Sequence, residues 1–473
     1  MTTKLCILHT NDTHSYLDDF GKRAYLIKSI RQENQQAQAG TLLVDSGDVL
    51  TGNIYFNLYK GQREALLLNL LAYDAMTLGN HEFDEGSVTL ARFLETLEVP
   101  LITSNIDVAD DPYLNPFLGT KILPYLFKRL NVNTNVAIFG MTTPQTLDNA
   151  SPSDETHFHD PTETAIAMVE KLKQMGATSI ILLSHLGYQA DLALAEAVSG
   201  IDLILGGHSH HYLHEPTRIG QTAILQAGSF GKHLGRADLE FDDSGRVSKI
   251  DGCLIDIEAE TDEEPQVKAL VDDAKSDKKK YYSRTIADAE VELVGRRADL
   301  QKGETNLSKL VTNAYLKKAR DLGYPVQISI INGMGIRTSI LPGPISYGDI
   351  YKVLPFGCCL SMFELTGKEI KDTIECGFYP QTSGLLGVLD KRRPKAQVCG
   401  LRLLDGTPIC DDDTYLVATN TYVGSGRDQY VGFRTGRLLA DNLELDLQLF
   451  SDYLVSLPQP ITYLTPDDLI TKV

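Results

Sequence analysis

Five short apolar runs in the first half of the chain each end in an Asp, an Asn or a His. The runs are rich in leucine or β-branched residues and have the length of a strand; they read LCILHT, TLLVDS, DAMTL, SIILLS and DLILGG. They alternate with amphipathic stretches up to about residue 257, a pattern typical of a layered α/β domain. In sheets built this way, ligand sites lie beyond the carboxyl ends of the strands. We therefore expect the five polar ends to converge on one site.

The converging side chains form a set suited to divalent metal ions. They are Asp12, His14, Asp48, Asn80, His185, His208 and His210. Mixed nitrogen and oxygen donors suit Mn²⁺, Zn²⁺, Co²⁺ or Fe and are unlike a thiolate zinc site. Seven ligands exceed what one ion needs, and two ions that share a bridging carboxylate account for the number. Each motif alone is most often a turn, a cap or an ordinary hydrogen-bonded residue. Their combination at strand ends favours a dinuclear site.

The length of the chain, 473 residues, predicts two domains, because one hydrophobic core rarely grows beyond about 250–300 residues. Residues 258–285 are charge-dense, with apolar residues at helical spacing, and indicate a partly exposed linking helix. Beyond them lie further strand-like and helical runs, namely VQISIING, GLRLL, YLVATNTY, NLSKLVTNAYLKKARD and TGKEIKDTIECG. We predict a first domain at residues 1–260, a linking helix and hinge at 261–290, and a second domain at 291–473.

The charge balance and the chain start narrow the partners and the location. There are 63 acidic and 44 basic residues, a net charge of −19, which argues against nucleic acid or an anionic membrane surface as a partner. No apolar stretch reaches about 18 residues, and MTTKLCILHT lacks the pattern of a secretory signal. We therefore expect a cytoplasmic protein, or a secreted one if a signal peptide has been removed. Seven cysteines, an odd number, indicate reduced thiols.

Five motifs of the first half closely resemble those of the calcineurin-like metallophosphoesterases. The motifs are NDTH, DSGD, LGNHEFDEG, LSHLG and GGHSHH. The longer GNHEFD is similar to that of the 5′-nucleotidases and UDP-sugar hydrolases, in particular the cytosolic bacterial members. This resemblance implies a four-layer α/β/β/α catalytic domain, followed by a smaller α/β substrate-binding domain. It also implies the metal ligands: Asp12, His14 and His210 for one ion, Asn80, His185 and His208 for the other, and Asp48 as the bridge.

The resemblance also implies a mechanism that needs no protein nucleophile. A water or hydroxide held by the metal pair attacks phosphorus, while the cations offset the charge on the phosphoryl oxygens. His81 is expected to stabilise the transition state or to protonate the departing oxygen. Asp84 is expected to orient the imidazole and favour its charged form. For Glu82 we expect no chemical role, only that of a solvated or capping carboxylate in the loop.

Three segments of the second half resemble parts of the family's nucleotide site. IINGMGIRTSILPG resembles a nucleotide-binding segment and implies Asn332 and Arg337 at the substrate. VLPFG and NTYVGSGRDQY resemble the segments that hold the nucleobase, and they imply Phe356 and Tyr422 on its two faces with Asp428 beside it. One departure concerns phosphate binding, because Gly303 stands where relatives usually carry an arginine.

The sequence therefore predicts a dinuclear-metal phosphohydrolase that releases phosphate from nucleoside 5′-monophosphates. UDP-sugars and other nucleotide anhydrides are further candidate substrates. In this family the substrate-binding domain rotates against the catalytic one, so we expect a hinge near residues 275–300. Two alternatives stay open: a 2′,3′-cyclic-nucleotide phosphodiesterase with 3′-nucleotidase activity, and a nucleotide-binding sensor with a vestigial metal site. We expect a monomer or a weak dimer.

Overall fold

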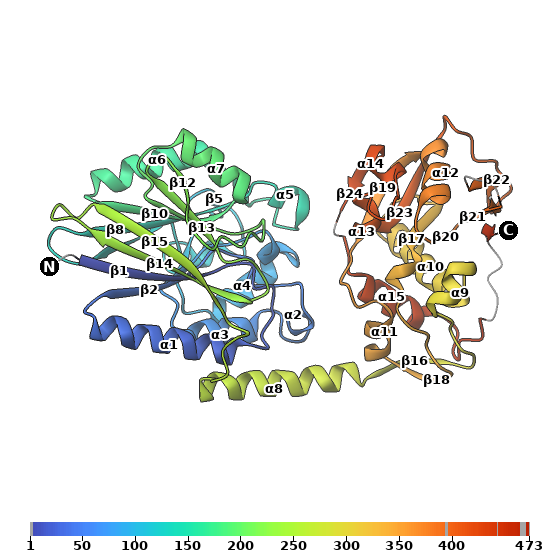
Figure 1. Ribbon diagram of the computed structural model, residues 1–473, viewed down its shortest axis with the longest axis horizontal. Helices are drawn as coiled ribbons and strands as arrows, with labels where there is room; N and C mark the ends of the chain where they lie inside the picture. Colours follow the sequence, from blue (N-terminus) through green and yellow to red (C-terminus); the bar gives the residue numbers. More distant parts are fainter. Residues whose placement is uncertain (1–2, 393–395, 442, 464–469, 473) are drawn as a thin grey trace. The chain divides into compact units, whose positions relative to one another are not determined.

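The computed structural model describes residues 3–392, 396–441, 443–463 and 470–472. The chain divides into two compact units, Met1–Lys278 and Lys279–Val473, which are here called unit 1 and unit 2. Figure 1 shows that each unit has its own sheets and helices. All seven cysteines lie among the described residues, and no disulfide joins any of them. No described helix combines the length and the apolar composition needed to cross a lipid bilayer.

Two mixed β-sheets form the centre of unit 1. The strands of the first sheet are β1 (Thr3–Thr10), β2 (Gly40–Asp45), β3 (Ala75–Met76), β4 (Leu101–Ile102), β6 (Ile122–Leu123), β14 (His233–Phe241) and β15 (Val247–Asp256). Those of the second sheet are β7 (Tyr125–Arg129), β8 (Asn135–Thr142), β10 (Ser179–His185), β11 (Leu203–Gly206), β12 (Thr217–Ile219) and β13 (Thr222–Gln226). The strand orders are β15-β14-β1-β2-β3-β4-β6 and β12-β13-β11-β10-β8-β7. A separate ribbon pairs β5 (Ile106–Asp107) with β9 (His157–Phe158).

Helices cover the outer face of each sheet in unit 1. They are α1 (Phe20–Gln36), α2 (Ile54–Tyr59), α3 (Gln62–Leu71), α4 (Gly86–Thr96), α5 (Thr146–Asn149), α6 (Pro161–Gln174), α7 (Tyr188–Ala197) and α8 (Pro265–Tyr282). Helices α1, α3 and α4 pack on the first sheet, and α6 and α7 pack on the second (Figure 1). The apolar side of α8, with Val267, Val271 and Ala274 buried, joins the core of the first sheet.

The alternation of side chains along the strands produces this layering. In β1, Leu5 and Ile7 point to the core between the two sheets, whereas Cys6 and Leu8 point to the core under the helices. Strands buried on both faces read as continuous apolar runs, which is what the sequence shows at these positions. The four-layer α/β/β/α arrangement is thereby confirmed.

The strands that precede the predicted ligands run parallel within each sheet. β1, β2 and β3 are parallel neighbours in the first sheet, and β10 and β11 are parallel neighbours in the second. Parallel neighbours bring their carboxyl ends to the same edge of a sheet. The loops after these five strands therefore lie at two adjacent sheet edges, above a rigid apolar core.

Unit 2 is built on one five-stranded sheet with the order β20-β17-β23-β19-β24. Its strands are β17 (Ile328–Asn332), β19 (Leu360–Thr366), β20 (Pro380–Ser383), β23 (Thr414–Asn420) and β24 (Arg437–Ala440). The smaller pairings involve β16 (Thr285–Ala289) with β18 (Gly343–Ser346), and β21 (Leu385–Asp390) with β22 (Gln397–Leu403) and β25 (Ile470–Lys472). The helices are α9 (Arg297–Lys302), α10 (Asn306–Asp321), α11 (Tyr347–Val353), α12 (Gly367–Cys376), α13 (Thr421–Gly424), α14 (Gly432–Thr435) and α15 (Asp446–Ser456).

Two cores flank the five-stranded sheet of unit 2. Helices α10, α11 and α15 contribute to one core, and α12 with β21 and β22 contributes to the other. A mixed sheet with helices on both faces is an α/β domain, so the expected α/β class of the second domain is confirmed.

Candidate functional site

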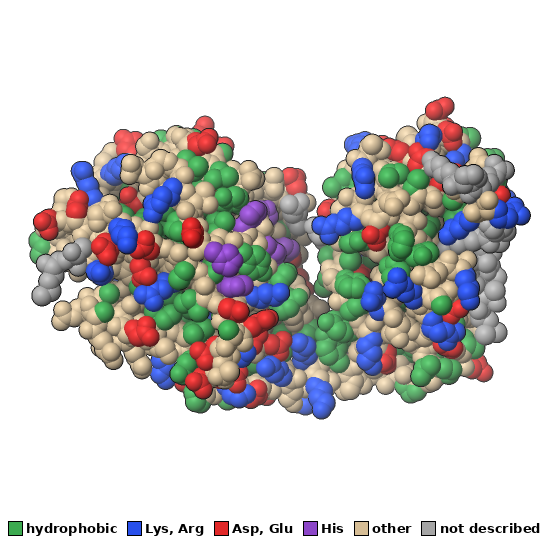
Figure 2. Space-filling view, viewed as in Figure 1, with side chains coloured by type: hydrophobic (Ala, Val, Ile, Leu, Met, Phe, Trp, Pro, Cys, Tyr) green, Lys and Arg blue, Asp and Glu red, His purple; other side chains and the backbone are tan. Residues whose placement is uncertain are grey.

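Six of the seven side chains predicted as metal ligands form close groups at the strand ends of unit 1. Potential ligand atoms of Asp12, His14 and His210 lie within 4.8 Å of one another, and so do those of Asp48, His185 and His208. A third such group joins Asp48 and His14 to His81. Asp48 thus belongs to two groups, which is the position that a bridging carboxylate requires. Figure 2 shows that the histidines visible on unit 1 gather in one area of its surface.

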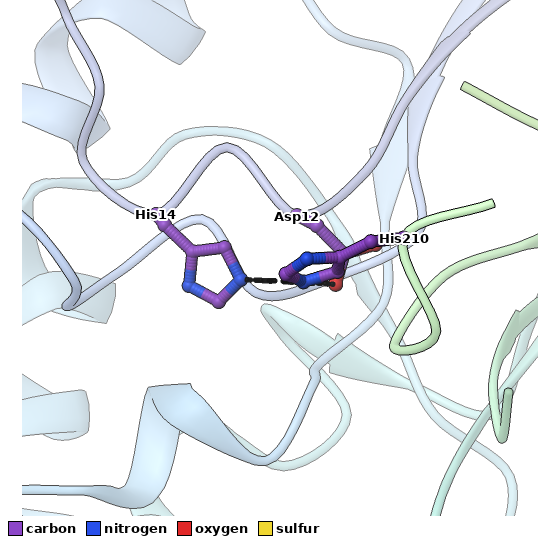
Figure 3. A group of neighbouring side chains, drawn as sticks. All are labelled: Asp12, His14 and His210. Atoms are coloured by element: carbon purple, nitrogen blue, oxygen red, sulfur yellow. Dashed lines mark hydrogen bonds and ion pairs between the residues drawn. The ribbon is translucent and has the colours of Figure 1, made fainter. Parts of the chain in front are cut away.

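The first group combines the loop after β1 with the loop after β11. Figure 3 shows Asp12 and His14 on one loop and His210 on the other, with the two imidazoles turned toward each other. The Nε2 atoms of His14 and His210 are 3.1 Å apart, and Oδ1 of Asp12 lies 3.3 Å from Nε2 of His210. Two nitrogens and a carboxylate oxygen that face one small space form a donor set that fits a divalent cation.

The second group contains buried polar atoms without hydrogen-bond partners. Nδ1 of His185 lies 2.6 Å from the carbonyl oxygen of Ser46 and donates to it, so Nε2 is the ring nitrogen that can bind a metal once it has lost its proton. This Nε2 lies 2.9 Å from Oδ2 of Asp48 but without the alignment of a hydrogen bond. Oδ1 of Asn80 is also buried and unpartnered. Such atoms are costly unless they bind something, and a cation satisfies both.

The ligand residues have unusual backbone conformations. Five of the seven have positive φ angles: Asp12 (49°), His14 (50°), Asp48 (56°), His208 (70°) and His210 (55°). Left-handed conformations of residues other than glycine are uncommon and cluster at functional sites. Close packing adds a constraint, because a Cβ atom on Gly79 would lie 2.0 Å from Oδ1 of Asp48. The unusual backbone conformations of these loops therefore bring the ligand side chains together.

Burial and the nearby carboxylates set the protonation of the imidazoles. Burial lowers the pKa of His14 to about 4, so this ring is neutral and has a lone pair for a metal at neutral pH. Burial also acts to lower the pKa of His185, but the adjacent Asp48 carboxylate outweighs it and raises the pKa to about 10. Among the protein's own charges, a proton on His185 thus balances Asp48. Metal binding at such a position displaces that proton.

His81 and Asp84 form the predicted dyad beside the ligand groups. Nδ1 of His81 lies 2.7 Å from Oδ2 of Asp84, which also accepts the hydroxyl of Thr51 at 2.8 Å. Burial acts to lower the pKa of His81, but the carboxylates of Asp48 and Asp84 raise it to about 9. The imidazole is partly exposed, and its ring centroid is 5.0 Å from that of His14. A protonated imidazole fixed at Nδ1 has its Nε2–H available as a general acid.

Of the two roles expected for Glu82, a solvated or a capping carboxylate, the structure excludes the first. A solvated carboxylate was one expectation for this residue, but its side chain is buried, with 2% of the residue exposed. It accepts hydrogen bonds from backbone N–H groups of both ligand loops. No local sequence signal distinguishes such a buried acceptor from an ordinary loop glutamate.

The five residues predicted to bind substrate line one cavity of unit 2. The cavity has a volume of about 330 Å³, and its lining includes Asn332, Arg337, Phe356, Tyr422 and Asp428. Phe356 is 60% exposed as a residue, and the guanidinium carbon of Arg337 lies 5.5 Å from the centroid of its ring. Burial and a hydrogen bond to Asp428 raise the pKa of Tyr422. The wall also contains Asn420, which donates to Oδ1 of Asn332 at 3.2 Å.

A second cavity of unit 2 gathers cationic side chains that the sequence interpretation did not single out. Its volume is about 660 Å³, and its lining includes Arg296, Arg297, Lys352 and also Arg337, which it shares with the first cavity. Arg296 is paired with Glu292 and Asp299, and Lys352 is paired with Asp349. Arg297 has no ion pair with a described residue. The consecutive arginines of VGRRADL were the available sequence signal.

Comparisons with known proteins agree with this two-part organisation. The profile of the calcineurin-like phosphoesterases matches residues 6–212, and that of the 5′-nucleotidase C-terminal domain matches residues 285–435. The chain is 30% identical to a snake venom 5′-nucleotidase of Naja atra, over 95% of this chain and 96% of that protein. It is 33% identical over 97% of its length to the trifunctional nucleotide phosphoesterase protein YfkN of Bacillus subtilis, but it spans only 34% of that protein.

Solved structures give the same picture. A 5′-nucleotidase precursor of Thermus thermophilus is similar over 99% of both chains, with a TM-score of 0.62 and 31% identity. The NAD nucleotidase of Haemophilus influenzae is similar over 100% of this chain and 99% of that one, with a TM-score of 0.75. At 22% identity, the second likeness concerns the fold alone.

Replacing Asp48, the carboxylate common to two of the groups, tests the candidate metal centre. We expect Asp48→Asn to lose most bound metal and to lower the hydrolysis of p-nitrophenyl phosphate by about a thousandfold or more, because several kcal/mol of transition-state stabilisation depend on bound cations. The measurements are metal content by mass spectrometry and the steady-state rate. A variant that retained its metal content would contradict the position of Asp48 as the shared ligand.

Replacing His81 separates proton transfer from metal binding. We expect His81→Asn to keep the metal content and to lower kcat by about 10²–10⁴-fold, the range for loss of a general acid. Rates and metal content are measured on the same preparation. Loss of metal with an unchanged rate per bound ion would instead make His81 a ligand.

Proposed function

The chain belongs to the 5′-nucleotidase family of calcineurin-like phosphoesterases, and from this premise we propose that it removes the phosphate from nucleoside 5′-monophosphates with two divalent metal ions. One observation carries the proposal. The same chain has six of the predicted ligand side chains in close groups in unit 1 and a nucleotide-sized cavity in unit 2 whose lining includes Phe356 and Tyr422. A phosphoesterase without nucleotide specificity needs only the first of these features.

Phosphoesterases of this family use divalent metals, and the donor set fits them. Asp12, His14 and His210 would hold one ion. Asn80, His185 and His208 would hold the other, with Asp48 shared. Imidazole, carboxylate and amide donors accept Mn²⁺, Zn²⁺, Co²⁺ or Fe. When bound, the ions lower the pKa of a water for attack on phosphorus and offset the charge of the phosphoryl oxygens.

The protein itself supplies the proton for the leaving group, and the donor is His81. His81 is held through Nδ1 by Asp84, and its Nε2–H donates a proton to the oxygen that leaves with the nucleoside. The raised pKa of His81 keeps the imidazole protonated at neutral pH among the protein's own charges. Because a 5′-alkoxide is a poor leaving group, this proton transfer contributes directly to the rate.

The cavity of unit 2 has the composition of a nucleoside site. Phe356 and Tyr422 supply aromatic surfaces for the faces of a base, and this kind of stacking tolerates different bases. Asp428 and Asn332 supply polar atoms for the edge of the base and the sugar hydroxyls. A mainly apolar wall with a few polar groups is typical of a small-molecule site.

Cationic residues next to this cavity support the binding of a phosphate. Arg337 lines both cavities of unit 2, and the second cavity adds Arg297, which has no carboxylate partner among the described residues. An arginine without such a partner has all of its donors available for a phosphate. This arrangement compensates for Gly303, which stands where relatives usually carry an arginine.

We also propose that residues 275–300 contain a hinge, through which substrate held by unit 2 reaches the metal centre.

A substrate panel tests the reaction. With Mn²⁺ or Co²⁺ added, we expect AMP to be hydrolysed with a higher kcat/KM than UDP-glucose or 2′,3′-cyclic AMP, and we expect a chelator to abolish all activity. Release of phosphate and nucleoside is measured by colorimetry and chromatography. Preference for 2′,3′-cyclic AMP would identify the cyclic phosphodiesterase alternative. Metal-loaded protein that binds AMP without turnover would identify a sensor.

Removing one aromatic ring tests the recognition of the base. We expect Phe356→Ala to raise the KM for AMP by about tenfold, because stacking on one ring contributes about 1–3 kcal/mol per base. Hydrolysis of p-nitrophenyl phosphate should not change, since that reaction needs no base. Leu438→Ala, which shortens an exposed apolar side chain outside both cavities of unit 2, is the matched control. Equal effects on the two substrates would contradict this role of Phe356.

A further inference from the structure

Glu82 has no part in the chemistry described above, yet its carboxylate is enclosed by backbone N–H groups. Oε2 accepts from Gly79 at 2.6 Å and from Asp48 at 3.0 Å. Oε1 accepts from Val49 at 2.7 Å and from Leu50 at 3.1 Å. The residue is 2% exposed, so these bonds form away from water. Bonds from amides to a buried carboxylate are among the stronger ones in a protein.

The four amides belong to two loops that carry metal ligands. Asp48, Val49 and Leu50 follow β2, and Gly79 follows β3 directly before Asn80. Glu82 therefore ties the loop of the shared carboxylate to the loop of Asn80. Both loops leave the same sheet edge, beyond the last backbone bond between them in the described part of the chain, which runs from the N–H of Thr77 to the carbonyl of Asp45.

The bonds of Glu82 complete the anchoring of the Asp48 loop. The N–H of Ser46 donates to the carbonyl of Thr10, and the N–H of Gly47 donates to Oδ1 of Asp45. The next three N–H groups all donate to Glu82, so five consecutive amides are fixed. Within this run Gly47 and Asp48 have positive φ angles of 90° and 56°. Such a backbone persists only where its surroundings hold it.

A small movement of this loop would affect both ligand groups. Oδ1 of Asp48 accepts the N–H of His81 at 2.9 Å. Oδ2 lies 2.9 Å from Nε2 of His185 and 3.9 Å from Nε2 of His14. Metal affinity depends on ligand positions within a few tenths of an ångström. The backbone amides that position Asp48 therefore influence the affinity for both metal ions.

The geometry also excludes a direct role for Glu82 in binding metal. A carboxylate oxygen has about two lone pairs, and each oxygen of Glu82 already accepts two N–H groups. Glu82 is accordingly in none of the groups of potential ligand atoms found among the described residues. Its effect on the metals has to pass through Asp48 and Asn80.

We propose that Glu82 is a positioning residue. By fixing the position of Asp48, it increases the affinity of the site for its metal ions. Its carboxylate fixes the Asp48 loop against the Asn80 loop through these four backbone bonds, so that Asp48 is held between the two ligand groups before any cation arrives. The inference rests on the proposed function only in taking these side chains as metal ligands. The identity of the phosphoester does not enter it.

The test compares the parent protein with Glu82→Gln by Mn²⁺ titration. Glutamine has nearly the same shape, but its amide group presents donors to two of the four N–H groups. We expect the variant to bind the weaker of two Mn²⁺ ions at least tenfold less tightly, by calorimetry. We also expect a changed spin-coupled Mn²⁺ signal in electron paramagnetic resonance. At saturating Mn²⁺ the KM for the substrate should stay within twofold of the parent value, while kcat falls.

A matched control distinguishes positioning from general stability. Asp111 is also buried, and its Oδ1 accepts the backbone N–H groups of Tyr113 and Leu114, outside the ligand loops. Asp111→Asn should lower the melting temperature without changing Mn²⁺ affinity. If Glu82→Gln does not fold, Glu82→Asp keeps the charge on a shorter side chain, and we expect a smaller loss of Mn²⁺ affinity in the same direction.

The outcomes separate this inference from the proposed function. Unchanged Mn²⁺ affinity and signal in a folded Glu82 variant, with only a lower melting temperature, would overturn the positioning role. A parent protein that bound none of Mn²⁺, Zn²⁺, Co²⁺ and Fe in the same titration would overturn both proposals. If the parent bound two Mn²⁺ ions but hydrolysed no nucleotide, only the proposed function would fail, and the effect of Glu82 on affinity would still decide the inference.

Discussion

The carboxylate of Asp48 is the interaction on which the whole site depends. It accepts the N–H of His81, lies against His185 and faces His14, so one side chain connects the dyad with both ligand groups. Its position is costly to maintain, because the backbone at Asp48 is left-handed and the carboxylate is buried. The two packed sheets make this possible, since a dense core on both faces of β2 gives the loop a rigid base.

Much of the architecture could be predicted from local patterns. The helical run NLSKLVTNAYLKKARD corresponds residue for residue to α10 (Asn306–Asp321), and TGKEIKDTIECG contains α12 (Gly367–Cys376). The five apolar runs each overlap a strand of unit 1, because strands buried on both faces leave a continuous apolar signal. The pairing of these strands into two stacked sheets is not a local property. It came from the family resemblance and not from periodicity.

The residues that escaped prediction depend on contacts between distant segments. Glu82 lies in a polar stretch, and its burial follows from bonds to Val49 and Leu50, more than thirty positions earlier in the chain. Arg297 lines a cavity with the predicted Arg337, forty positions later, only because the strands and turns between them fold back. Single-sequence patterns report periodicity and local capping, so groups that gain their role from tertiary packing leave little trace in them.

Separate hydrophobic cores have a consequence for how such a protein can change over generations. The side chains for hydrolysis stand on the core of the stacked sheets, whereas those suited to holding the organic part of a substrate stand on a different core. Mutations that reshape the second core need not disturb the first, since substitutions without shared neighbours add nearly independently. Proteins that descend from one ancestral chain can therefore change substrate while they keep the same hydrolytic site.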